Sequence, residues 1–348
     1  MRHRYRTCRR LAGASRSAGK STFLEALAAV RGVVNGLALA TVLPQGSLAW
    51  WDRRVLQTFE LEFDDPVGDK KFRYRLRVRH SESGPPMVDE ESVVCDGTPL
   101  LTFAKKRVTI FAEDGTAQSF AFEGGHSPLS AGMGDNSQLS RCRVLFLGVS
   151  MFKLNPWSMV ARSTGESGGL NTDGSNFVDW VRGVALDDPE GFSRWQANLK
   201  MALPHIQSLR LQDLGAGSRL LTGMMSRPDN AEQPIPFYDF SEGEKCLAVL
   251  HAVAVTRGRN VVLSLDEPDN FLSLRELQPV LREIIEPIKG ASPQIFVVSH
   301  HPESIDYLAA DSTWLFERPM GAHVRVRAMT FDRSKGERAS ESVRIELQ

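Results

Sequence analysis

Two adjacent carboxylates, Asp266 and Glu267, follow a short, mostly apolar run at residues 261–265. Such a run is typical of a buried parallel strand. Carboxylates at the carboxyl end of a parallel strand lie where open α/β sheets bind ligands. The first could hold Mg²⁺, directly or through water, and the second could orient and deprotonate an attacking water. An Asp-Glu pair after a strand is also a common turn, so the interpretation needs support elsewhere in the chain.

A phosphate-binding loop is indicated near the N-terminus, where Gly19, Lys20, Ser21 and Thr22 open a predicted helix. Backbone N–H groups at a helix N-terminus bind phosphate. The lysine can reach the β- and γ-phosphates of a nucleotide, and Ser21 can ligate Mg²⁺. An ordinary helix start is the alternative interpretation of the same four residues.

The loop departs from the full pattern G-x-x-x-x-G-K-[ST]. The first glycine of that pattern falls on Ala14, and Arg16 and Ser17 stand where related loops prefer Asn and Gly. Each added β-carbon restricts the backbone angles that let N–H groups converge on a phosphate. In addition, residues 1–11 do not have the pattern of the strand that should precede such a loop.

Two further segments could contact a γ-phosphate. Ser241 and Gly243 precede a predicted helix, and a serine side chain with a glycine backbone at a helix N-terminus suits phosphate. Ser241 and Glu244 also fit the capping box S-x-x-E, and both roles are compatible. His300 follows an apolar strand at 294–299 and could reach the γ-phosphate or the attacking water, although a surface histidine is the commoner finding.

Composition excludes several classes of protein. Lys+Arg and Asp+Glu each total 42, so the net charge favours no particular partner. The four cysteines form no C-x-x-C pair, which argues against a zinc site or a disulfide framework and fits the reducing cytoplasm. No apolar run approaches the length of a membrane span, so no membrane partner is expected.

The elements that must position these residues follow two patterns. Residues 56–125 contain short strands separated by turn signals, which predicts an antiparallel β lobe. Helices are expected to dominate residues 177–214, and helix alternates with strand after Ser241, which implies a parallel sheet with crossover helices. The predicted parts are an N-terminal core segment with the phosphate loop at 1–55, the β lobe at 56–125, a helical subdomain at 126–235, and a C-terminal core segment at 236–348.

The strand at residues 71–79 carries a basic face, formed by Lys71, Arg73, Arg75, Arg77 and Arg79. Such a face could track a nucleic-acid backbone. A hairpin with the preceding strand would instead make a salt ladder of the pairs Asp64–Lys71, Glu62–Arg73 and Glu60–Arg75. The ladder leaves Arg77 and Arg79 without acidic partners, so possible DNA contact is assigned to these two residues.

The order of the motifs resembles ABC-type ATPases of the RecF/SMC-like group, in the branch of stand-alone AAA-family ATPases related to the OLD proteins. The gaps of 23 residues from Gly243 to Asp266 and of 34 from Asp266 to His300 suit that group. The β lobe and the Asp-Gly-Ser-Asn element at 173–176 match it as well. The resemblance implies an α/β fold, a P-loop NTPase head of the ABC type with a mostly parallel sheet, plus an antiparallel β lobe and a helical subdomain.

The resemblance also implies a role for each motif residue. The Walker A loop is matched by Lys20 and Ser21, with Gly19 and Thr22 beside them. The Walker B aspartate and the catalytic glutamate are matched by Asp266 and Glu267. The signature motif is matched by Ser241 and Gly243, and the switch histidine by His300. No glutamine can be placed as the Q-loop. The implied cofactors are ATP and Mg²⁺, with nucleotide held between two copies in an ATP-dependent homodimer. Loss of the γ-phosphate would then release the two heads.

The family usually has about two strands before its phosphate loop, and this chain lacks room for them. The hypothesis that explains the missing strands is an altered start codon or a shifted reading frame. DNA repair and anti-phage defence are the expected contexts. The alternative is a hydrolysis-poor, nucleotide-sensing scaffold that regulates a separately encoded effector, as the degenerate loop suggests. A transporter ATPase subunit is a third interpretation, disfavoured by the β lobe and the run at 266–270.

Overall fold

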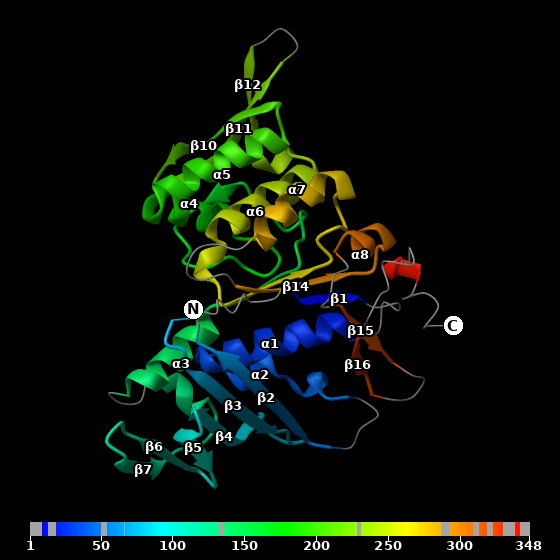
Figure 1. Cartoon of the computed structure of the whole chain (residues 1–348). Coiled ribbons are helices and arrows are strands. Elements are labelled where there is room, and N and C mark those ends of the chain that lie inside the picture. The colour runs from blue at the N-terminus through cyan, green and yellow to red at the C-terminus, as the bar shows by residue number, and fades with distance from the viewer. Residues whose placement is uncertain are drawn as a thin grey trace. The chain divides into compact units, whose positions relative to one another are not determined.

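The chain folds as two compact units in the computed structural model (Figure 1), one formed by Met1–Leu24 with Ser150–Gln348 and the other by Glu25–Val149. The structure describes residues 9–12, 19–49, 54–65, 67–131, 136–227, 231–286, 293–308, 313–318, 323–329 and 338–341. Helix α1 (Lys20–Val34) begins in the first unit and continues into the second. The candidate phosphate, carboxylate, signature and histidine residues all lie in the first unit.

The first unit is built on a six-stranded sheet in the order β16-β15-β1-β14-β13-β8. Its strands are β1 (Arg9–Ala12), β8 (Val149–Phe152), β13 (Val262–Asp266), β14 (Gln294–Ser299), β15 (Thr313–Glu317) and β16 (Arg325–Ala328). Strand β1 runs parallel to both β14 and β15, and β13 runs parallel to β14, whereas β16 is antiparallel to β15. The predicted parallel sheet is therefore present, with an antiparallel strand at one edge.

Strand β1 corrects one expectation, because Arg9–Ala12 is a strand that precedes the phosphate loop. The sequence pattern did not predict this strand because it contains Arg9 and Arg10, whereas a central parallel strand is usually a continuous apolar run. Backbone pairing on both sides, with β14 and β15, holds this segment extended. Tertiary pairing outweighs local preference here.

Helices of the first unit share one hydrophobic core with β13 and β14 of this sheet. Those of the first unit after β8 are α4 (Phe177–Asp187), α5 (Pro189–Ala202), α6 (Glu242–Thr256), α7 (Leu274–Ile285) and α8 (Pro302–Leu308), with one-turn 3₁₀ helices at Phe237–Asp239 and Arg257–Arg259. Helix α6 is buried along nearly its whole length, and the Trp195 indole N–H of α5 donates to the Ala248 carbonyl oxygen at 2.8 Å. Capping boxes begin α6 at Ser241 and α7 at Ser273. None of the helices in the described part of the chain has the length and apolar character needed to cross a bilayer.

The expectation of helix up to residue 214 is wrong beyond α5. A small antiparallel sheet follows instead, made of β9 (Arg162–Ser163), β10 (Ile206–Gly215), β11 (Ser218–Ser226) and β12 (Glu232–Pro236). A tight turn joins β10 to β11, and Gly215, Ala216 and Gly217 all have positive φ angles of 82°, 50° and 75°. Glycines adopt such angles without strain, so the Gly-Ala-Gly sequence favours a hairpin over a continued helix.

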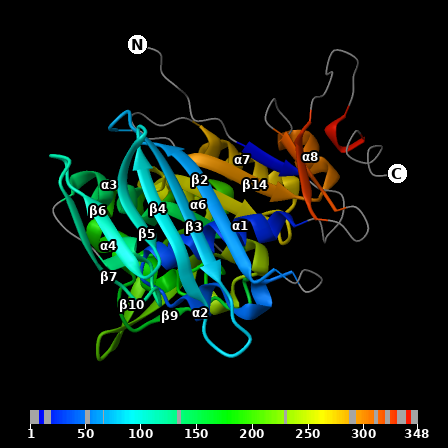
Figure 2. The ribbon, with the colours of Figure 1, turned by 90° about the horizontal axis from the view of Figure 1, so that it is seen from below.

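The second unit is the predicted β lobe, an antiparallel sheet whose strands run side by side in chain order, as Figure 2 shows. Its strands are β2 (Leu56–Asp64), β3 (Lys71–Arg79), β4 (Met87–Cys95), β5 (Thr98–Ala104), β6 (Arg107–Phe111) and β7 (Ala117–Ala121). Its other elements are the rest of α1, α2 (Leu39–Val42), α3 (Ser137–Leu147) and 3₁₀ turns at Gln45–Ser47 and Pro128–Ala131. Phe146 of α3 packs on the sheet, with its ring 5.0 Å from that of Phe63 and 4.8 Å from that of Tyr74.

Candidate functional site

Three parallel strands end at the same edge of the first sheet. Ala12, the last residue of β1, stands opposite Ser299, the last residue of β14. Asp266, the last residue of β13, stands opposite Val298. Carboxyl ends of parallel strands form the ligand-binding edge of an open α/β sheet. The two carboxylates and His300 therefore lie at this edge, and Lys20 is within electrostatic reach of both carboxylates.

Asp266 is a buried carboxylate at the end of β13. Its side chain has 0 % exposure, and neither carboxylate oxygen accepts a hydrogen bond from the described residues. The ammonium of Lys153 lies 3.3 Å from Asp266 Oδ2, which is an ion pair rather than a hydrogen bond. A buried carboxylate is costly unless a cation or donor compensates it. The two orphaned oxygens are therefore suited to a divalent cation such as Mg²⁺, whose preferred ligands are oxygens.

Glu267 is held in an unusual backbone conformation by its neighbours. Its φ angle is +52°, in the left-handed region that non-glycine residues rarely adopt. Its Oε1 lies 3.1 Å from His300 Nδ1, and its Oε2 accepts a hydrogen bond of 3.1 Å from Asn270 Nδ2. Burial raises the pKa of the Glu267 carboxyl, but the Asn270 hydrogen bond and the charges of His300 and Lys153 outweigh it. The net pKa lies below the ordinary value, so the carboxylate is ionised at neutral pH.

Lys20 is buried close to both carboxylates. It opens α1 and is 5 % exposed, directly after Gly19, whose φ angle is +83°. Burial lowers the pKa of the Lys20 ammonium, and the negative charges of Glu267 and Asp266 oppose that shift. Ser21 and Thr22 lie in the same first turn of α1. The substituted loop positions Ala14, Arg16 and Ser17 lie outside the described residues.

Ser241 and Gly243 lie at the N-terminus of α6, where the predicted capping box is present. The Ser241 hydroxyl accepts a hydrogen bond of 3.3 Å from the Glu244 N–H, and Glu244 Oε2 accepts one of 2.8 Å from the Ser241 N–H. A Cβ on Gly243 would lie 3.1 Å from the Phe271 carbonyl oxygen. The signature segment thus packs against the loop that follows Glu267 in the chain.

Three residues that contribute to the site were not predicted as site residues from the sequence. Lys153 follows β8, the neighbour of β13 in the sheet, and an isolated lysine after a short strand carries no signal. Asn270 follows the carboxylate pair by three residues and donates back to Glu267. Asp269 Oδ2 accepts a hydrogen bond of 2.6 Å from the hydroxyl of Ser299. Asp269 and Asn270 belong to the run Asp-Glu-Pro-Asp-Asn at 266–270, but the run alone does not show that the chain turns after Glu267 and returns their side chains to Ser299 and Glu267.

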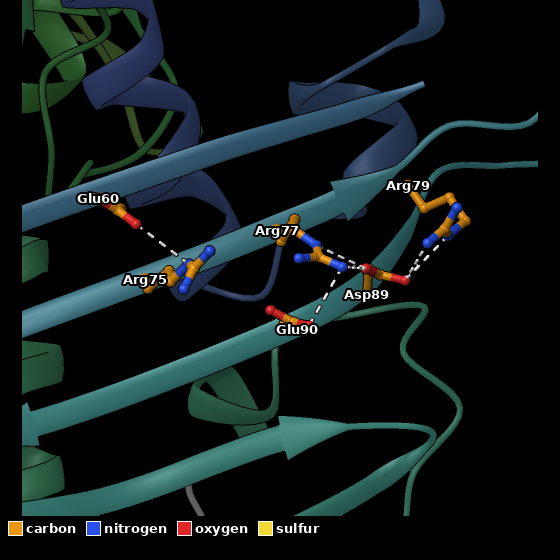
Figure 3. A network of polar contacts seen from close by, with 6 residues as sticks. All are labelled: Glu60, Arg75, Arg77, Arg79, Asp89 and Glu90. Atoms are coloured by element: carbon orange, nitrogen blue, oxygen red, sulfur yellow. Dashed lines mark hydrogen bonds and ion pairs between the residues drawn. The ribbon is translucent and has the colours of Figure 1, made fainter. Parts of the chain in front are cut away.

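The basic face of the β lobe is neutralised, which corrects the basis for DNA contact by Arg77 and Arg79. The predicted register holds, with Glu60 opposite Arg75 and Glu62 opposite Arg73. Arg77 and Arg79 both pair with Asp89 of β4, at 2.7 and 2.9 Å (Figure 3). Glu90 adds a second partner 3.3 Å from Arg77. Neither arginine is the unpaired cation that the hairpin alone implied.

Comparisons with known proteins place these features in a wider context. Residues 170–306 match the family model described as "AAA domain, putative AbiEii toxin, Type IV TA system", a range that holds the signature, carboxylate and histidine positions but not Lys20. No curated protein matches this chain.

Solved structures of SMC heads are similar to this chain. A crystal structure of an SMC head bound to the C-terminal winged-helix domain of ScpA has 13% identity and a TM-score of 0.57, over 94% of this chain and 92% of that one. An SMC head domain from Thermotoga maritima has 12% identity and a TM-score of 0.45, over 92% and 90%. An SMC head with an extended coiled coil, bound to the C-terminal domain of ScpA and derived from Pyrococcus furiosus, has 11% and 0.46, over 97% and 93%.

The first of these structures and the family match bear on the fold of the chain. At 13% identity the likeness concerns the fold, and it extends over nearly the whole chain. The chain therefore has the α/β fold of an SMC head and resembles the RecF/SMC-like P-loop ATPases, as the order of its motifs indicated.

Proposed function

We propose that the protein binds and hydrolyses ATP as an ABC-type ATPase, and that ATP joins two copies of it. The observation that carries this proposal is the convergence at one sheet edge of a buried lysine, two carboxylates and a histidine. Lys20 lies within the electrostatic reach of Asp266 and Glu267, and His300 Nδ1 lies 3.1 Å from Glu267. Phosphoryl transfer requires a lysine that binds the phosphates, an aspartate that holds the metal and a glutamate that orients the attacking water.

Lys20 and the first turn of α1 would bind the phosphates. A helix N-terminus offers backbone N–H groups and a favourable dipole to an anion. The lysine adds a positive charge in a buried setting, where electrostatic attraction is stronger than in water. Asp266 and Ser21 would hold Mg²⁺, a role that the orphaned oxygens of Asp266 support. When bound, the metal would offset negative charge on the phosphates.

Glu267 would orient the attacking water and accept its proton. A general base must be ionised before it can accept a proton, and the lowered pKa of Glu267 meets that condition. Asn270 and His300 contact opposite oxygens of this carboxylate and so fix its orientation. His300 would therefore act mainly as a positioning residue for Glu267 while the γ-phosphate is bound.

Ser241 and Gly243 would serve the nucleotide bound to a second copy of the chain. The resemblance to RecF/SMC-like ATPases suggests this arrangement, in which the signature of one copy covers the Walker A loop of the other. The Ser241 hydroxyl also donates to Glu244 Oε2 at 3.0 Å. Contact with a γ-phosphate would therefore require this hydroxyl to turn away from its capping partner.

ATP turnover by the purified protein and by Glu267→Gln tests the proposal. Removing the base while keeping the shape should lower kcat by about 10²-fold or more, with ATP affinity retained, because general-base catalysis typically contributes ~10²–10⁴. The matched control is Glu190→Gln, an exposed glutamate in the first turn of α5. Turnover that survives Glu267→Gln unchanged would contradict the assignment of the base.

The cellular role that we propose is DNA repair or anti-phage defence. The toxin–antitoxin description of the matching family model supports the defence context. Because the arginines of β3 are paired with carboxylates, the proposed DNA contact is no longer assigned to them in particular. Stimulation of ATP turnover by duplex DNA would favour repair, whereas a co-expressed effector whose activity follows ATP would favour defence.

A hydrolysis-poor nucleotide sensor that regulates a separate effector is the second candidate. The substitutions at Ala14, Arg16 and Ser17 favour it, since they weaken the pattern of a phosphate loop. ATP binding without turnover, with the same affinity in Glu267→Gln, would be the result that selects this candidate.

A further inference from the structure

The carboxylate that is proposed to bind metal, Asp266, has an ammonium group beside it. Lys153 Nζ lies 3.3 Å from Asp266 Oδ2, and the lysine side chain is 46% exposed whereas that of Asp266 is wholly buried. The lysine backbone is fixed, because its N–H donates to the Thr172 carbonyl oxygen at 2.8 Å. A fixed backbone with a solvent-accessible head group means that the ammonium can leave by rotation of its own side chain.

Asp266 needs this ammonium in the absence of metal. Its two oxygens accept no hydrogen bond from the described residues, so among these residues nearby positive charge offsets the cost of burying it. Lys20 contributes some of that charge, because it interacts electrostatically with Asp266. A divalent cation bound by Asp266 would place two further positive charges within a few ångströms of Lys153, and like charges in a partly buried site repel strongly.

We infer that Lys153 is a positioning residue that occupies Asp266 in the nucleotide-free protein and is displaced when a divalent metal binds. This inference rests on the proposed function, which makes Asp266 the metal ligand. Metal binding then includes the cost of breaking the ion pair, so Lys153 weakens metal binding while it keeps the empty site folded.

Mn²⁺ binding to the nucleotide-free protein tests this directly, with free Mn²⁺ followed by its paramagnetic resonance signal. Lys153→Met keeps the length of the side chain and removes the charge, so it should bind Mn²⁺ about tenfold more tightly than the wild type. Lys153→Arg, which retains the charge, should behave like the wild type. So should Lys200→Met, which makes the same change at an exposed lysine in the last turn of α5. Equal or weaker binding by Lys153→Met, or no binding by any of these proteins, overturns the inference.

Thermal unfolding provides a second readout that does not depend on turnover. Without metal, Lys153→Met should unfold a few degrees below the wild type, because Asp266 loses its counter-charge, and saturating Mn²⁺ should remove the difference. An unchanged melting temperature without metal would also overturn the inference.

Asp266→Asn separates the two proposals. If it abolishes Mn²⁺ binding while Lys153→Met leaves binding unchanged, the metal site stands and only the role of Lys153 fails. If Asp266→Asn binds Mn²⁺ as the wild type does, the metal site itself fails, and the inference fails with it.

Discussion

At the scale of single residues, Glu267 combines a strained backbone with an orienting set of polar contacts. Strained residues persist where the surroundings determine them, and they gather at functional sites. Here the N–H of Glu267 donates to the Val298 carbonyl oxygen at 2.9 Å, while the side chain meets His300 and Asn270. The sheet edge thus fixes both ends of the residue in a conformation that its own preferences disfavour.

The backbone strain predicts that Glu267→Gly is more stable than Glu267→Ala, which is the reverse of the usual order for these two residues. Glu267→Gly and Glu267→Ala lose the same side-chain contacts, but alanine must still adopt the left-handed conformation, which costs a non-glycine residue ~1–2 kcal/mol. We therefore expect the glycine variant to be more stable by about 1 kcal/mol, after allowing for the greater freedom of glycine in the unfolded chain. Urea unfolding of the nucleotide-free proteins measures this difference.

Arg194, exposed in the middle of α5, supplies the control for that order. In a helix interior glycine is ~1 kcal/mol worse than alanine, so Arg194→Gly should be the less stable of its pair. An alanine variant at 267 that equals or exceeds the glycine variant would show that the backbone at this position is unstrained in solution.

Residue-scale prediction from sequence succeeded where the neighbourhood is local. Asp266 ends one apolar strand and His300 directly follows another, so their positions at the carboxyl edge of the sheet follow from the strand pattern alone. Lys153 could not be found in this way. Its partner is 113 positions away, and only the pairing of β8 beside β13 brings the two together.

At the scale of elements, the ion pairs of the β lobe could be predicted from the sequence within the hairpin of β2 and β3 but not beyond it. The register of β2 and β3 was predicted from alternating charge, and the Glu62–Arg73 pair at 2.7 Å confirms it. The partners of Arg77 and Arg79 come from β4, where a bulge inserts Asp89 as an extra residue. A bulge places two residues opposite one, and sequence patterning does not reveal where it falls. Strand β4 therefore supplies the acidic partners that the hairpin of β2 and β3 lacks for Arg77 and Arg79.

A buried ion pair ties α3 to the turn after β2 in this lobe. Arg141 Nε donates to Asp65 Oδ2 at 2.8 Å, and the Asp65 side chain is 3% exposed. The hydrogen bonds from Arg141 lower the pKa of Asp65 to about 2, although burial opposes them. A depressed folded-state pKa adds stability above the unfolded pKa near 3.8, and this stability is lost as the pH falls through about 2.

Asp65→Asn should therefore destabilise the β lobe in a pH-dependent way. The expected loss is about 2 kcal/mol at pH 7 and about half of that at pH 3, from the size of the pKa shift. Urea unfolding at the two pH values measures it, with Glu82→Gln in the exposed loop between β3 and β4 as the control. A loss that is the same at both pH values would mean that packing, rather than the ion pair, links Asp65 to the fold.

At the scale of the whole molecule, the chain has the fold of an SMC head at 13% sequence identity. The alternation of helix and strand after Ser241 was enough to predict the parallel sheet, because buried strands and amphipathic helices leave strong periodic signals. Strand β1 and the sheet β10–β12 were missed, since their sequences lack those signals and long-range pairing or tight turns determine them. In this chain, β1, β13 and β14 end at one edge of that sheet.

The mass of Glu267→Gln in solution, with and without Mg²⁺ and ATP, tests most directly whether nucleotide joins two copies at this edge. Light scattering after gel filtration should give 38.6 kDa without ATP and twice that mass with it. Adding Lys20→Ala, which removes the proposed phosphate contact, or Ser241→Arg, which blocks the proposed signature face, should each keep the protein monomeric. A Glu267→Gln protein that binds ATP at saturation and still has the mass of one chain would contradict nucleotide-gated dimerisation.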